Sequence, residues 1–308
     1  MVETKIEKNL SSILSNDYVL EVSSGTAGII ISLLLHNNKE KNEVILPSIC
    51  CPAVLTAINF CNMIPIFVDM EKKYFNMNID NIKNSINKNT LAVIGVHSYG
   101  IALDVKEVKN LCNENNILLI EDCCLAIGGE VNDKPIGSYG DISVFSFGYD
   151  KIISAAGGGI ALKNKEDFIK AKKLIEKNNI LKCPPYKNEE IQTHFDNLEE
   201  NKINRNRIAK IYNEKINNAK ATKPAYRKTD VYWRYPLLFK GERSALINKA
   251  KERNLIITYH YPSLANFQYG NELAVSDEFN NSIINLFVNI NTDDNYIEKV
   301  CTLINEYE

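Results

Sequence analysis

Apolar residues along the first half of the chain alternate between two spacings, one typical of buried strands and one typical of helices. Short, continuously apolar runs at 44–46, 91–96 and 117–120 are typical of strands that are buried on both faces. Between them, apolar positions recur at helical spacing, as in 52–60 and 105–113. This alternation predicts an α/β fold with a mainly parallel central sheet and helices on both faces.

The same pattern places the remaining elements. In the first half we predict further helices at 2–14, 28–35 and 79–86, and further strands at 18–22, 64–69, 142–147 and 159–162. In the second half we predict helices at 165–177, 196–218, 243–253, 277–285 and 296–307, strands at 231–239 and 255–259, and an irregular segment at 178–190. The change in pattern divides the chain into a large α/β domain (1–205) and a small C-terminal α+β domain (206–308).

One lysine stands between an apolar strand and a glycine cluster. The predicted strand at 142–147 stops at Gly148, Lys151 follows after a turn, and the glycines at 157–159 allow a close approach of the backbone or a positive φ. A lysine in a surface turn is the ordinary interpretation of such a position. Agreement with stretches at the ends of other predicted strands favours a functional role.

Two of these stretches lie at the edge where parallel sheets bind ligands. The segment SSGTAG at 23–28 precedes a helix, so its N–H groups and the positive helix end outline a phosphate site, although N-capping alone also explains it. Asp122 follows the strand at 117–120. It either caps the next turn or, as a carboxylate, holds a heterocyclic nitrogen in its protonated state.

Composition and charge exclude several other functions. The 308 residues are 45% hydrophobic and carry a formal net charge of −2, so the chain lacks the basic field of a nucleic-acid-binding protein. Its eight cysteines have no CxxC spacing, and we interpret them as reduced residues of a cytoplasmic protein without a metal site. The longest apolar stretch is too short to span a bilayer, and we find no apolar signal region. We therefore expect no nucleic-acid or membrane partner.

Together these stretches resemble the DegT/DnrJ/EryC1/StrS family of pyridoxal-phosphate (PLP) aminotransferases, which act mostly on nucleotide-linked keto-sugars. The similarity is strongest from 18 to 162, and weaker similarity continues to 285. The matching segments are SSGTA at 23–27, PS at 47–48, PIFVD at 65–69, VHSYG at 96–100, ED at 121–122, VNDKPIGSYGD at 131–141, and FSF at 145–147 with Lys151. The resemblance implies the PLP-transferase fold of type I and a homodimer.

The resemblance also implies roles for individual residues. Lys151 would form the Schiff base with PLP, and Asp122 would pair with the pyridinium nitrogen. This chemistry needs a lysine that can be freed as a general base and a carboxylate that keeps the ring cationic. The phosphate would be held by groups of Ser24, Gly25, Thr26, Ala27 and Ser146.

Three departures from the family's pattern stand out. Leu125 replaces the usual glutamine, so it cannot donate a hydrogen bond to the cofactor's oxygen. Cys51 replaces an aromatic residue that commonly stacks on the cofactor, and it offers a smaller and softer cover. The GxNxRM-like segment, which in the family reaches across the dimer to the neighbour's phosphate, has no clear counterpart between 181 and 206. We still expect Cys51 and Leu125 to face the cofactor.

The leading hypothesis is a PLP-dependent aminotransferase that moves an amino group from glutamate onto a nucleotide-linked keto-sugar, for cell-surface polysaccharide or secondary-metabolite biosynthesis. Two alternatives remain open: a PLP enzyme of the same fold acting on a small ketone or amino acid, and a weakly active or non-catalytic paralogue. The candidate substrate contacts, for which a structural hydrogen bond or aromatic packing is the alternative role, are His97, Tyr99, His260 and Tyr261.

Overall fold

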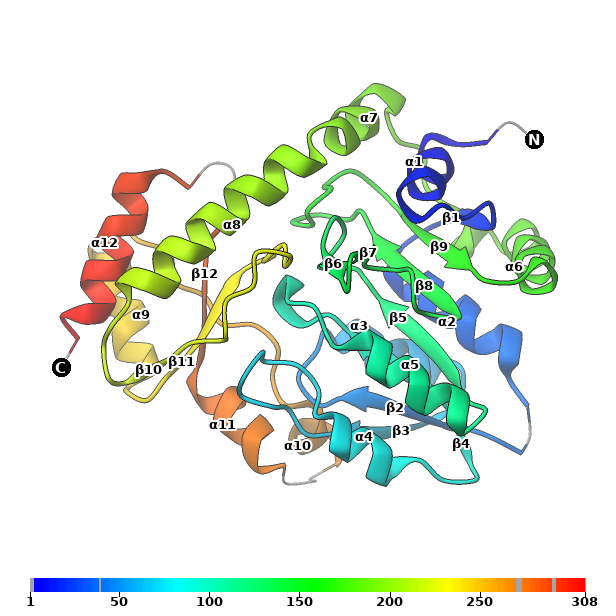
Figure 1. The fold of residues 1–308 in the computed structure, drawn as a ribbon, viewed down its shortest axis with the longest axis horizontal. Coiled ribbons are helices and arrows are strands. Elements are labelled where there is room, and N and C mark those ends of the chain that lie inside the picture. Colours follow the sequence, from blue (N-terminus) through cyan, green and yellow to red (C-terminus); the bar gives the residue numbers. More distant parts are fainter. Residues whose placement is uncertain (1–2, 39, 270–272, 290–291, 308) are drawn as a thin grey trace.

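A seven-stranded sheet forms the centre of the larger part of the molecule (Figure 1). The computed structural model describes residues 3–38, 40–269, 273–289 and 292–307. The strands β8, β5, β4, β2 and β3 are parallel, whereas β9 runs antiparallel to both β1 and β8. The predicted mainly parallel sheet is thus confirmed. In spatial order its strands are β1 (Val19–Val22), β9 (Gly158–Leu162), β8 (Ile142–Ser146), β5 (Leu118–Asp122), β4 (Thr90–Val96), β2 (Glu43–Pro47) and β3 (Ile64–Val68).

Helices cover both faces of this sheet, as the alternating pattern predicts. Gly28 lets the apolar helix α2 lie directly on the sheet, because a Cβ at this position would come within 2.7 Å of Val144. One face carries α2 (Gly25–His36), α3 (Pro52–Phe60) and α6 (Lys165–Lys177), and the other carries α1 (Lys5–Leu14), α4 (Ile79–Ser85) and α5 (Val105–Glu114). The strand ends are therefore the open edges at which a ligand can approach.

The second half of the chain builds a smaller antiparallel sheet, which lies to the left of the large sheet in Figure 1. Its core contains the fully buried side chains of Tyr212, Phe239 and Ile304. The strands are β10 (Ala221–Thr222), β11 (Tyr235–Phe239) and β12 (Ile283–Leu286), and the surrounding helices are α8 (Leu198–Lys215), α9 (Arg243–Glu252) and α12 (Asp294–Asn305). This part has the α+β character that the sequence predicts for a small domain.

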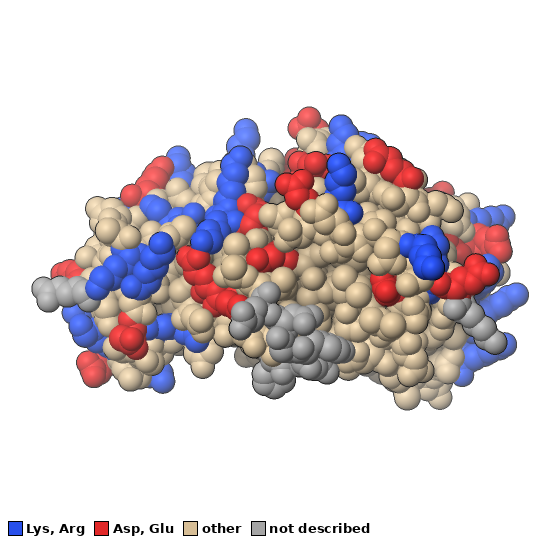
Figure 2. All heavy atoms as spheres, turned by 90° about the horizontal axis from the view of Figure 1, so that it is seen from below, with Lys and Arg blue, Asp and Glu red and all other residues tan. Residues whose placement is uncertain are grey.

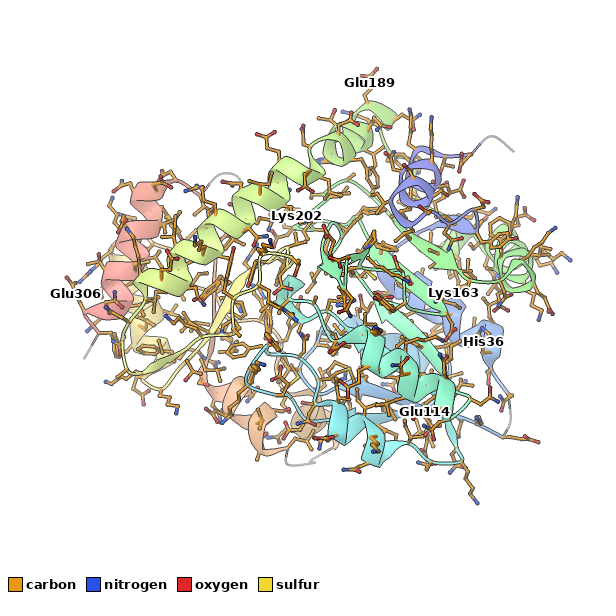
Figure 3. The ribbon with its side chains drawn as sticks, viewed as in Figure 1. His36, Glu114, Lys163, Glu189, Lys202 and Glu306 are labelled. Atoms are coloured by element: carbon orange, nitrogen blue, oxygen red, sulfur yellow. The ribbon has the colours of Figure 1, made fainter. Side chains whose placement is uncertain are left out.

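Helix α8 crosses the predicted domain boundary at residue 205. Leu198 is buried in a cluster with Phe145 of β8, whereas Tyr212 is buried in the core of the small sheet. Lys202 points toward the hairpin of β6 (Glu130–Val131) and β7 (Lys134–Pro135), where its Nζ lies 2.6 Å from Glu130 Oε1 (Figure 3). The helix contacts both parts of the molecule, and the boundary stays a prediction.

A cluster of hydrogen bonds, which we call the Asp69 clamp, attaches α11 (Ala274–Ser282) to the large sheet. The clamp consists of Asp69, Ser48, Val275 and Ser276. The Asp69 carboxylate accepts bonds from N–H of Val275 (3.1 Å) and of Ser276 (2.7 Å) and from Ser276 Oγ (2.6 Å), and Ser48 Oγ contacts Ser276 Oγ. The carboxylate thereby satisfies N–H groups at the start of α11 and fixes the helix at the ends of β2 and β3.

Two predictions for the segment before residue 240 are wrong in part. The helix predicted at 196–218 is confirmed as α8, and a separate helix that the sequence did not predict, α7 (Asn188–Asp196), precedes it and ends before Asn197. Part of the predicted irregular segment at 178–190 is therefore helical. The strand predicted at 231–239 begins only at Tyr235, because the N–H groups of residues 231 and 232 bond instead to the carbonyl of Gly100.

Two further predictions fail near the C-terminus. Residues 255–259 form no strand, and their contribution is an isolated bridge between Thr258 and Asn285. The helix predicted at 277–285 ends at Ser282, because the apolar residues that follow pair with β11 as β12. The remaining short helix of this region, α10 (Leu264–Tyr269), follows a bridge between Ile49 and Ser263.

Charged side chains of both signs are interspersed on the face seen in Figure 2, and they form no large patch of one sign there. Across the described ranges, no helix has both the length and the apolar character needed to cross a membrane.

Candidate active site

The loop that carries Lys151 connects β8 to β9 and is closed by backbone hydrogen bonds. Phe147 N donates to Gly157 O (2.9 Å), and Ala155 N donates to Phe147 O (2.8 Å). Gly157 has a φ of 75°, and a Cβ there would lie 2.3 Å from the Sγ of Cys183, so the position requires glycine. Ile152 and Ile153 are buried in the core beside the loop. Lys151 thus lies beside a firmly packed segment.

Lys151 lines a pocket at the carboxyl ends of the parallel strands. As the side chains stand, the cavity measures about 20 Å³, which is room for a single water molecule. A larger ligand therefore requires the lining side chains to move outward. The structure brings six of the predicted site residues together around this cavity: Cys51, His97, Asp122, Leu125, Lys151 and Tyr261.

Asp122 ends β5 and is 6% exposed. Its Oδ1 accepts a hydrogen bond from Cys124 N (3.0 Å), and the Cys124 thiol also contacts the carboxyl group. Its Oδ2 accepts no N–H or O–H donor among the residues that the structure describes. Burial, followed by the charge of Asp122, raises the pKa of the Cys124 thiol well above its usual value, so this thiol is neutral. A buried carboxylate with a free oxygen needs a positively charged or hydrogen-bonding partner.

The start of α2 lies beside the end of β8, the strand that leads into the Lys151 loop. A Cβ at Gly25 would come 2.6 Å from Cys124 Sγ and 3.2 Å from Ser146 Cβ. Ser24 caps the helix, and its Oγ accepts the N–H of Ala27 (3.1 Å). The predicted use of the Ala27 N–H for phosphate therefore competes with this cap. Within the described residues, the N–H groups of Gly25 and Thr26 have no acceptor, so they are the free donors of the first turn.

His97 is a structural residue at the wall of the pocket. Its Nδ1 accepts the N–H of Leu103 (3.0 Å), and its Nε2 lies 3.1 Å from Glu121 Oε1. Both ring nitrogens are thus engaged within the protein, and the substrate contact of His97 stays a prediction. Although the ligand atoms of His97, Glu121 and Cys123 lie close enough to hold a metal ion, the Glu121 carboxylate also accepts the N–H of Gly137 (2.7 Å), so we assign no metal to this cluster.

The other predicted substrate residues have different surroundings. Tyr99 is fully buried, and its hydroxyl donates to the carbonyl of His260 (3.3 Å), so the substrate contact of Tyr99 stays a prediction. The His260 ring packs against Trp233, with 5.3 Å between the centroids, and its pKa is lowered by burial and then by Arg234. Tyr261 lines the pocket and remains a candidate contact.

The sequence interpretation missed the link between Asp150 and the small domain. Arg234 Nη2 donates to Asp150 Oδ2 (2.6 Å), and Trp233 Nε1 donates to Asp150 O (2.5 Å). No local sequence pattern connects Trp233 or Arg234 to Asp150, which lies 83 and 84 positions away from them. The signal in the sequence was the charged residue directly before Lys151, opposite in sign to Arg234.

The donor set of this pocket fits the chemical groups of PLP. Lys151 supplies an amine, Asp122 supplies a carboxylate with a free oxygen, and the first turn of α2 with Ser146 supplies donors for a phosphate. Gly25 and Cys124 are in close contact, so a side chain at residue 25 would fill the space between the first turn of α2 and the Asp122 carboxylate's neighbour Cys124. Leu125 and Cys51 contribute apolar contact and no strong donor.

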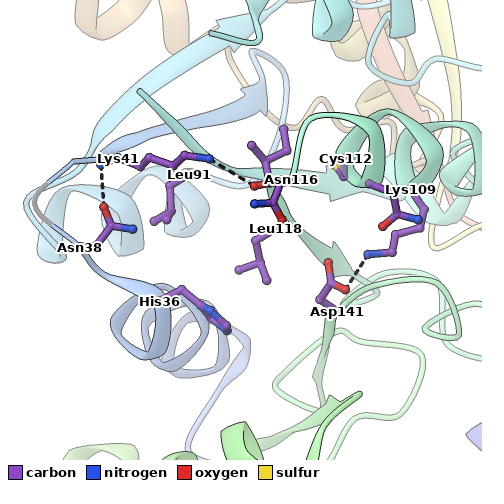
Figure 4. Close-up of a pocket in the computed structure, with 11 residues that line it drawn as sticks. His36, Asn38, Lys41, Leu91, Lys109, Cys112, Asn116, Leu118 and Asp141 are labelled. Atoms are coloured by element: carbon purple, nitrogen blue, oxygen red, sulfur yellow. Dashed lines mark hydrogen bonds and ion pairs between the residues drawn. The ribbon is translucent and has the colours of Figure 1, made fainter. Parts of the chain in front are cut away.

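A larger cavity of about 500 Å³ lies at the opposite, amino edge of the sheet (Figure 4). Its main charged groups are already paired. Lys109 Nζ lies 2.5 Å from Asp141 Oδ1, and Lys41 Nζ donates to the carbonyl of Asn116 (3.2 Å). This cavity lacks the free amine and carboxylate that the Lys151 pocket brings together.

Comparison with known proteins identifies relatives. GDP-perosamine synthase of Vibrio cholerae is 34% identical over 165 residues, covering 54% of this chain and 45% of that protein. An uncharacterised protein of Methanocaldococcus jannaschii is 28% identical over 289 residues, covering 83% and 75%. 3-Oxo-glucose-6-phosphate:glutamate aminotransferase of Bacillus subtilis is 34% identical over 164 residues, covering 53% and 36%. The match thus spans less than half the length of the two named enzymes.

Solved structures share the fold. Streptomyces venezuelae DesV, solved with a ketimine intermediate, has a TM-score of 0.90 at 17% identity, with 99% of this chain and 90% of that chain covered. Helicobacter pylori PseC, an aminotransferase of pseudoaminic acid biosynthesis, has a TM-score of 0.85 at 20% identity, with 97% and 89% covered. Streptococcus pneumoniae Spr1654 in its PLP form has a TM-score of 0.89 at 19% identity, with 99% and 91% covered. The fold is therefore that of PLP-dependent aminotransferases.

The sequence profile of the DegT/DnrJ/EryC1/StrS aminotransferase family matches residues 2–305, nearly the whole chain. This protein therefore belongs to the DegT/DnrJ/EryC1/StrS family, whose aminotransferases use PLP.

Proposed function

We propose that this protein is a PLP-dependent aminotransferase that transfers the amino group of glutamate to a keto-sugar carried by a nucleotide. The observation that carries the proposal is the meeting of Lys151 and Asp122 in one pocket beside the first turn of α2. In a chain of this family, this arrangement places the amine, the carboxylate and the phosphate donors on one side of the sheet. Family membership supports the reaction type.

Each of these residues has a separate task in the proposed reaction. When bound, the cofactor supplies a sink for the electrons left at Cα of the amino donor after its proton departs. Lys151 Nζ would hold the cofactor at rest and, once released, would move the proton from Cα of the amino donor to the cofactor carbon that accepts it. Asp122 Oδ2 keeps the ring nitrogen of the cofactor protonated. The N–H groups of Gly25 and Thr26, with Ser146 Oγ, bind the phosphate.

The substrate class rests on the relatives. One relative is named GDP-perosamine synthase, a second a UDP-N-acetyl-3-dehydro-glucosamine aminotransferase, and a third a glutamate aminotransferase of 3-oxo-glucose-6-phosphate. These names support a keto-sugar acceptor, a nucleotide carrier and glutamate as donor. A role in polysaccharide or secondary-metabolite biosynthesis follows as part of the same proposal.

Borohydride trapping tests the proposal directly. The protein is incubated with PLP, reduced with borohydride and digested, and the modified peptide is identified by mass spectrometry. We expect a single phosphopyridoxyl adduct on Lys151, and none in Lys151→Ala. The protein without reduction is expected to convert glutamate to 2-oxoglutarate in a single half-reaction. A chain that takes up no PLP, or an adduct on another lysine, would refute the assignment.

A further inference from the structure

Both neighbours of Lys151 are held by hydrogen bonds from outside the loop. On one side, Asp150 receives Arg234 Nη2 at its carboxylate (2.6 Å) and Trp233 Nε1 at its carbonyl (2.5 Å). On the other side, the carbonyl of Ile152 accepts Asn201 Nδ2 (3.3 Å). Lys151 therefore lies between two residues that are hydrogen-bonded to other elements: Asp150 to the segment before β11, and Ile152 to α8.

The anchoring groups are also tied to one another. Arg205 Nε donates to Asn201 Oδ1 (2.7 Å), and Arg205 Nη1 donates to the carbonyls of Tyr232 (3.1 Å) and Trp233 (3.2 Å). The guanidinium of Arg234 lies 4.6 Å from the centroid of the Trp233 ring. We call this closed network the lysine brace; it consists of Asp150, Asn201, Arg205, Trp233 and Arg234.

The brace is built from costly components. Arg205 and Arg234 are 5% and 3% exposed, and Asp150 is the acidic partner of Arg234. Arg234 Nε is buried without a hydrogen-bond partner among the described residues, and Asp150 has a φ of 61°. A non-glycine residue in the left-handed region and a buried free donor are both unfavourable on their own. Such features persist when the surrounding contacts require them.

Attachment of the small domain does not explain these costs. The Asp69 clamp already joins α11 to the large sheet with several hydrogen bonds. The brace lies at a different place: its side chains bond the residues before and after Lys151, while the backbone N–H groups of Trp233 and Arg234 bond the carbonyl of Tyr99 (2.8 and 3.5 Å). Its geometry therefore points to a task at the lysine itself.

We propose that Arg234 is a positioning residue: through Asp150 it fixes the backbone directly before Lys151 and so sets where the lysine amine stands in the pocket. This inference rests on the proposed function of Lys151. Removal of the Arg234–Asp150 contact should leave the amine in a wider range of positions. The covalent capture of PLP by Lys151 should then become slower, since fewer encounters find the amine in the reactive position.

The chain carries a built-in reporter for this network, because Trp233 is its one tryptophan. Tryptophan emission of the PLP-free protein is therefore recorded for Asp150→Ala, Arg234→Gln, Arg234→Lys and the double variant Asp150→Ala/Arg234→Gln. The matched control is Arg207→Gln, since Arg207 pairs with Asp294 in an exposed ion pair (2.7 Å) away from the loop. Capture of PLP is followed by absorbance in the same proteins, and folding is checked by thermal unfolding.

We expect Asp150→Ala and Arg234→Gln each to slow the capture of PLP about tenfold, as the loss of one charge-assisted hydrogen bond permits. The double variant should be no slower than the slower single variant, because both substitutions break one contact. Arg234→Lys should recover part of the rate. Tryptophan emission should shift in both single variants and stay unchanged in Arg207→Gln.

Two outcomes would overturn the inference and are distinguishable. If the unmodified protein captures PLP and the folded single variants capture it at the same rate, Arg234 has no positioning role while the proposed function stands. Effects that multiply in the double variant would have the same meaning, because they would be independent. If the unmodified protein captures no PLP, the proposed function fails and the inference fails with it.

Discussion

Asp122 and Leu125 lie three residues apart at the end of β5 and line the same pocket, yet they favour opposite kinds of ligand group. The carboxylate of Asp122 is buried with one oxygen free, so it requires a cation or a donor. Leu125 is 6% exposed and offers neither. The pocket is therefore polar where the ring nitrogen of PLP is proposed to lie and apolar beside it.

Asp122→Asn should leave the fold intact and remove most of the turnover. An amide neither holds the proton on the ring nitrogen nor supplies the opposing charge, and the loss in rate should be on the order of 10³-fold, about 4 kcal/mol in the barrier. The measurement is the rate of the glutamate half-reaction in protein saturated with PLP. Near-native turnover in a variant that still holds PLP would remove Asp122 from the mechanism.

Leu125→Gln should tighten the retention of PLP. The substitution preserves side-chain volume approximately and adds one donor, worth about 1 kcal/mol or roughly a fivefold lower dissociation rate. The companion change Cys51→Tyr is a poor test, because a cavity of about 20 Å³ has no room for the larger ring. Dissociation followed by dialysis against a PLP acceptor decides the matter, with Leu125→Met as the volume control. Equal rates in Gln, Met and Leu would mean that residue 125 does not face a polar group of the cofactor.

For single residues, the sequence predicted which side chains lie at the strand ends around the pocket, but it did not predict the hydrogen bonds that these side chains make. Position after an apolar strand placed Lys151 and Asp122 at one edge of the sheet, and the resemblance to the family placed Cys51 beside them; all three line one cavity. It could not reveal that both nitrogens of His97 are engaged, because Leu103 and Glu121 reach the ring from different segments. A sequence motif predicts where a residue lies in the fold, but it does not predict which atoms its side chain hydrogen-bonds.

Among the elements, the end of β5 depends on the turn at 137–140. Glu121 Oε1 accepts the N–H of Gly137 (2.7 Å), and Oε2 accepts the N–H groups of Tyr139 (2.9 Å) and Gly140 (2.7 Å). Burial alone would raise the pKa of Glu121, but His97 and the backbone N–H groups of Gly137 and Gly140 together hold this pKa below its usual value. The carboxylate therefore joins β5 to the segment that enters β8.

Glu121→Gln should destabilise the protein by about 3 kcal/mol, because the amide presents a donor to backbone donors and leaves them unpaired. Since the folded-state pKa is depressed, the stabilisation is full above the ordinary value of 4.5 and is lost as the pH falls through the folded-state pKa. Urea unfolding should therefore show a large gap between the two proteins at neutral pH and a smaller gap well below pH 4.5. Glu107→Gln, on the exposed side of α5, is the control and should match the parent protein.

The sequence predicted helices and strands correctly where a local pattern determines them, and incorrectly where pairing with a segment distant in the sequence determines them. Helices α3 and α6 have the predicted bounds, since each has a clear apolar stripe and a beginning at Pro52 or after Asn164. The run Ile283–Leu286 is a strand because it pairs with β11, and a short apolar run is compatible with helix or strand. Residues 231–234 were predicted as strand, yet their backbone is used to bond residues 99 and 100.

For the whole molecule, the predicted homodimer remains a proposal, and two exposed apolar side chains support it. Tyr149, two residues before Lys151, is 96% exposed, and Ile180 is 87% exposed. Large apolar side chains so exposed are typical of surfaces that a partner covers.

We expect sedimentation equilibrium to give a dimer and Tyr149→Lys to weaken it at least tenfold, by loss of an aromatic contact and addition of a charge. Ile203→Lys, at an exposed position of α8 (61% exposed), is a control for the added charge. A monomer that binds PLP tightly would contradict the dimer and leave the chemistry of the pocket untouched.

The lysine brace joins residues that lie 84 positions apart, and this separation has a consequence for synthesis. Chains emerge from the ribosome at roughly 5 to 20 residues per second, so Asp150 precedes Arg234 by roughly 4 to 17 s. During that interval the large sheet has its complete set of strands, whereas the amine beside Asp150 has no brace. The nascent chain therefore completes its large sheet first and acquires an ordered lysine only after the segment before β11 has been translated, which delays maturation of the enzyme until that segment arrives.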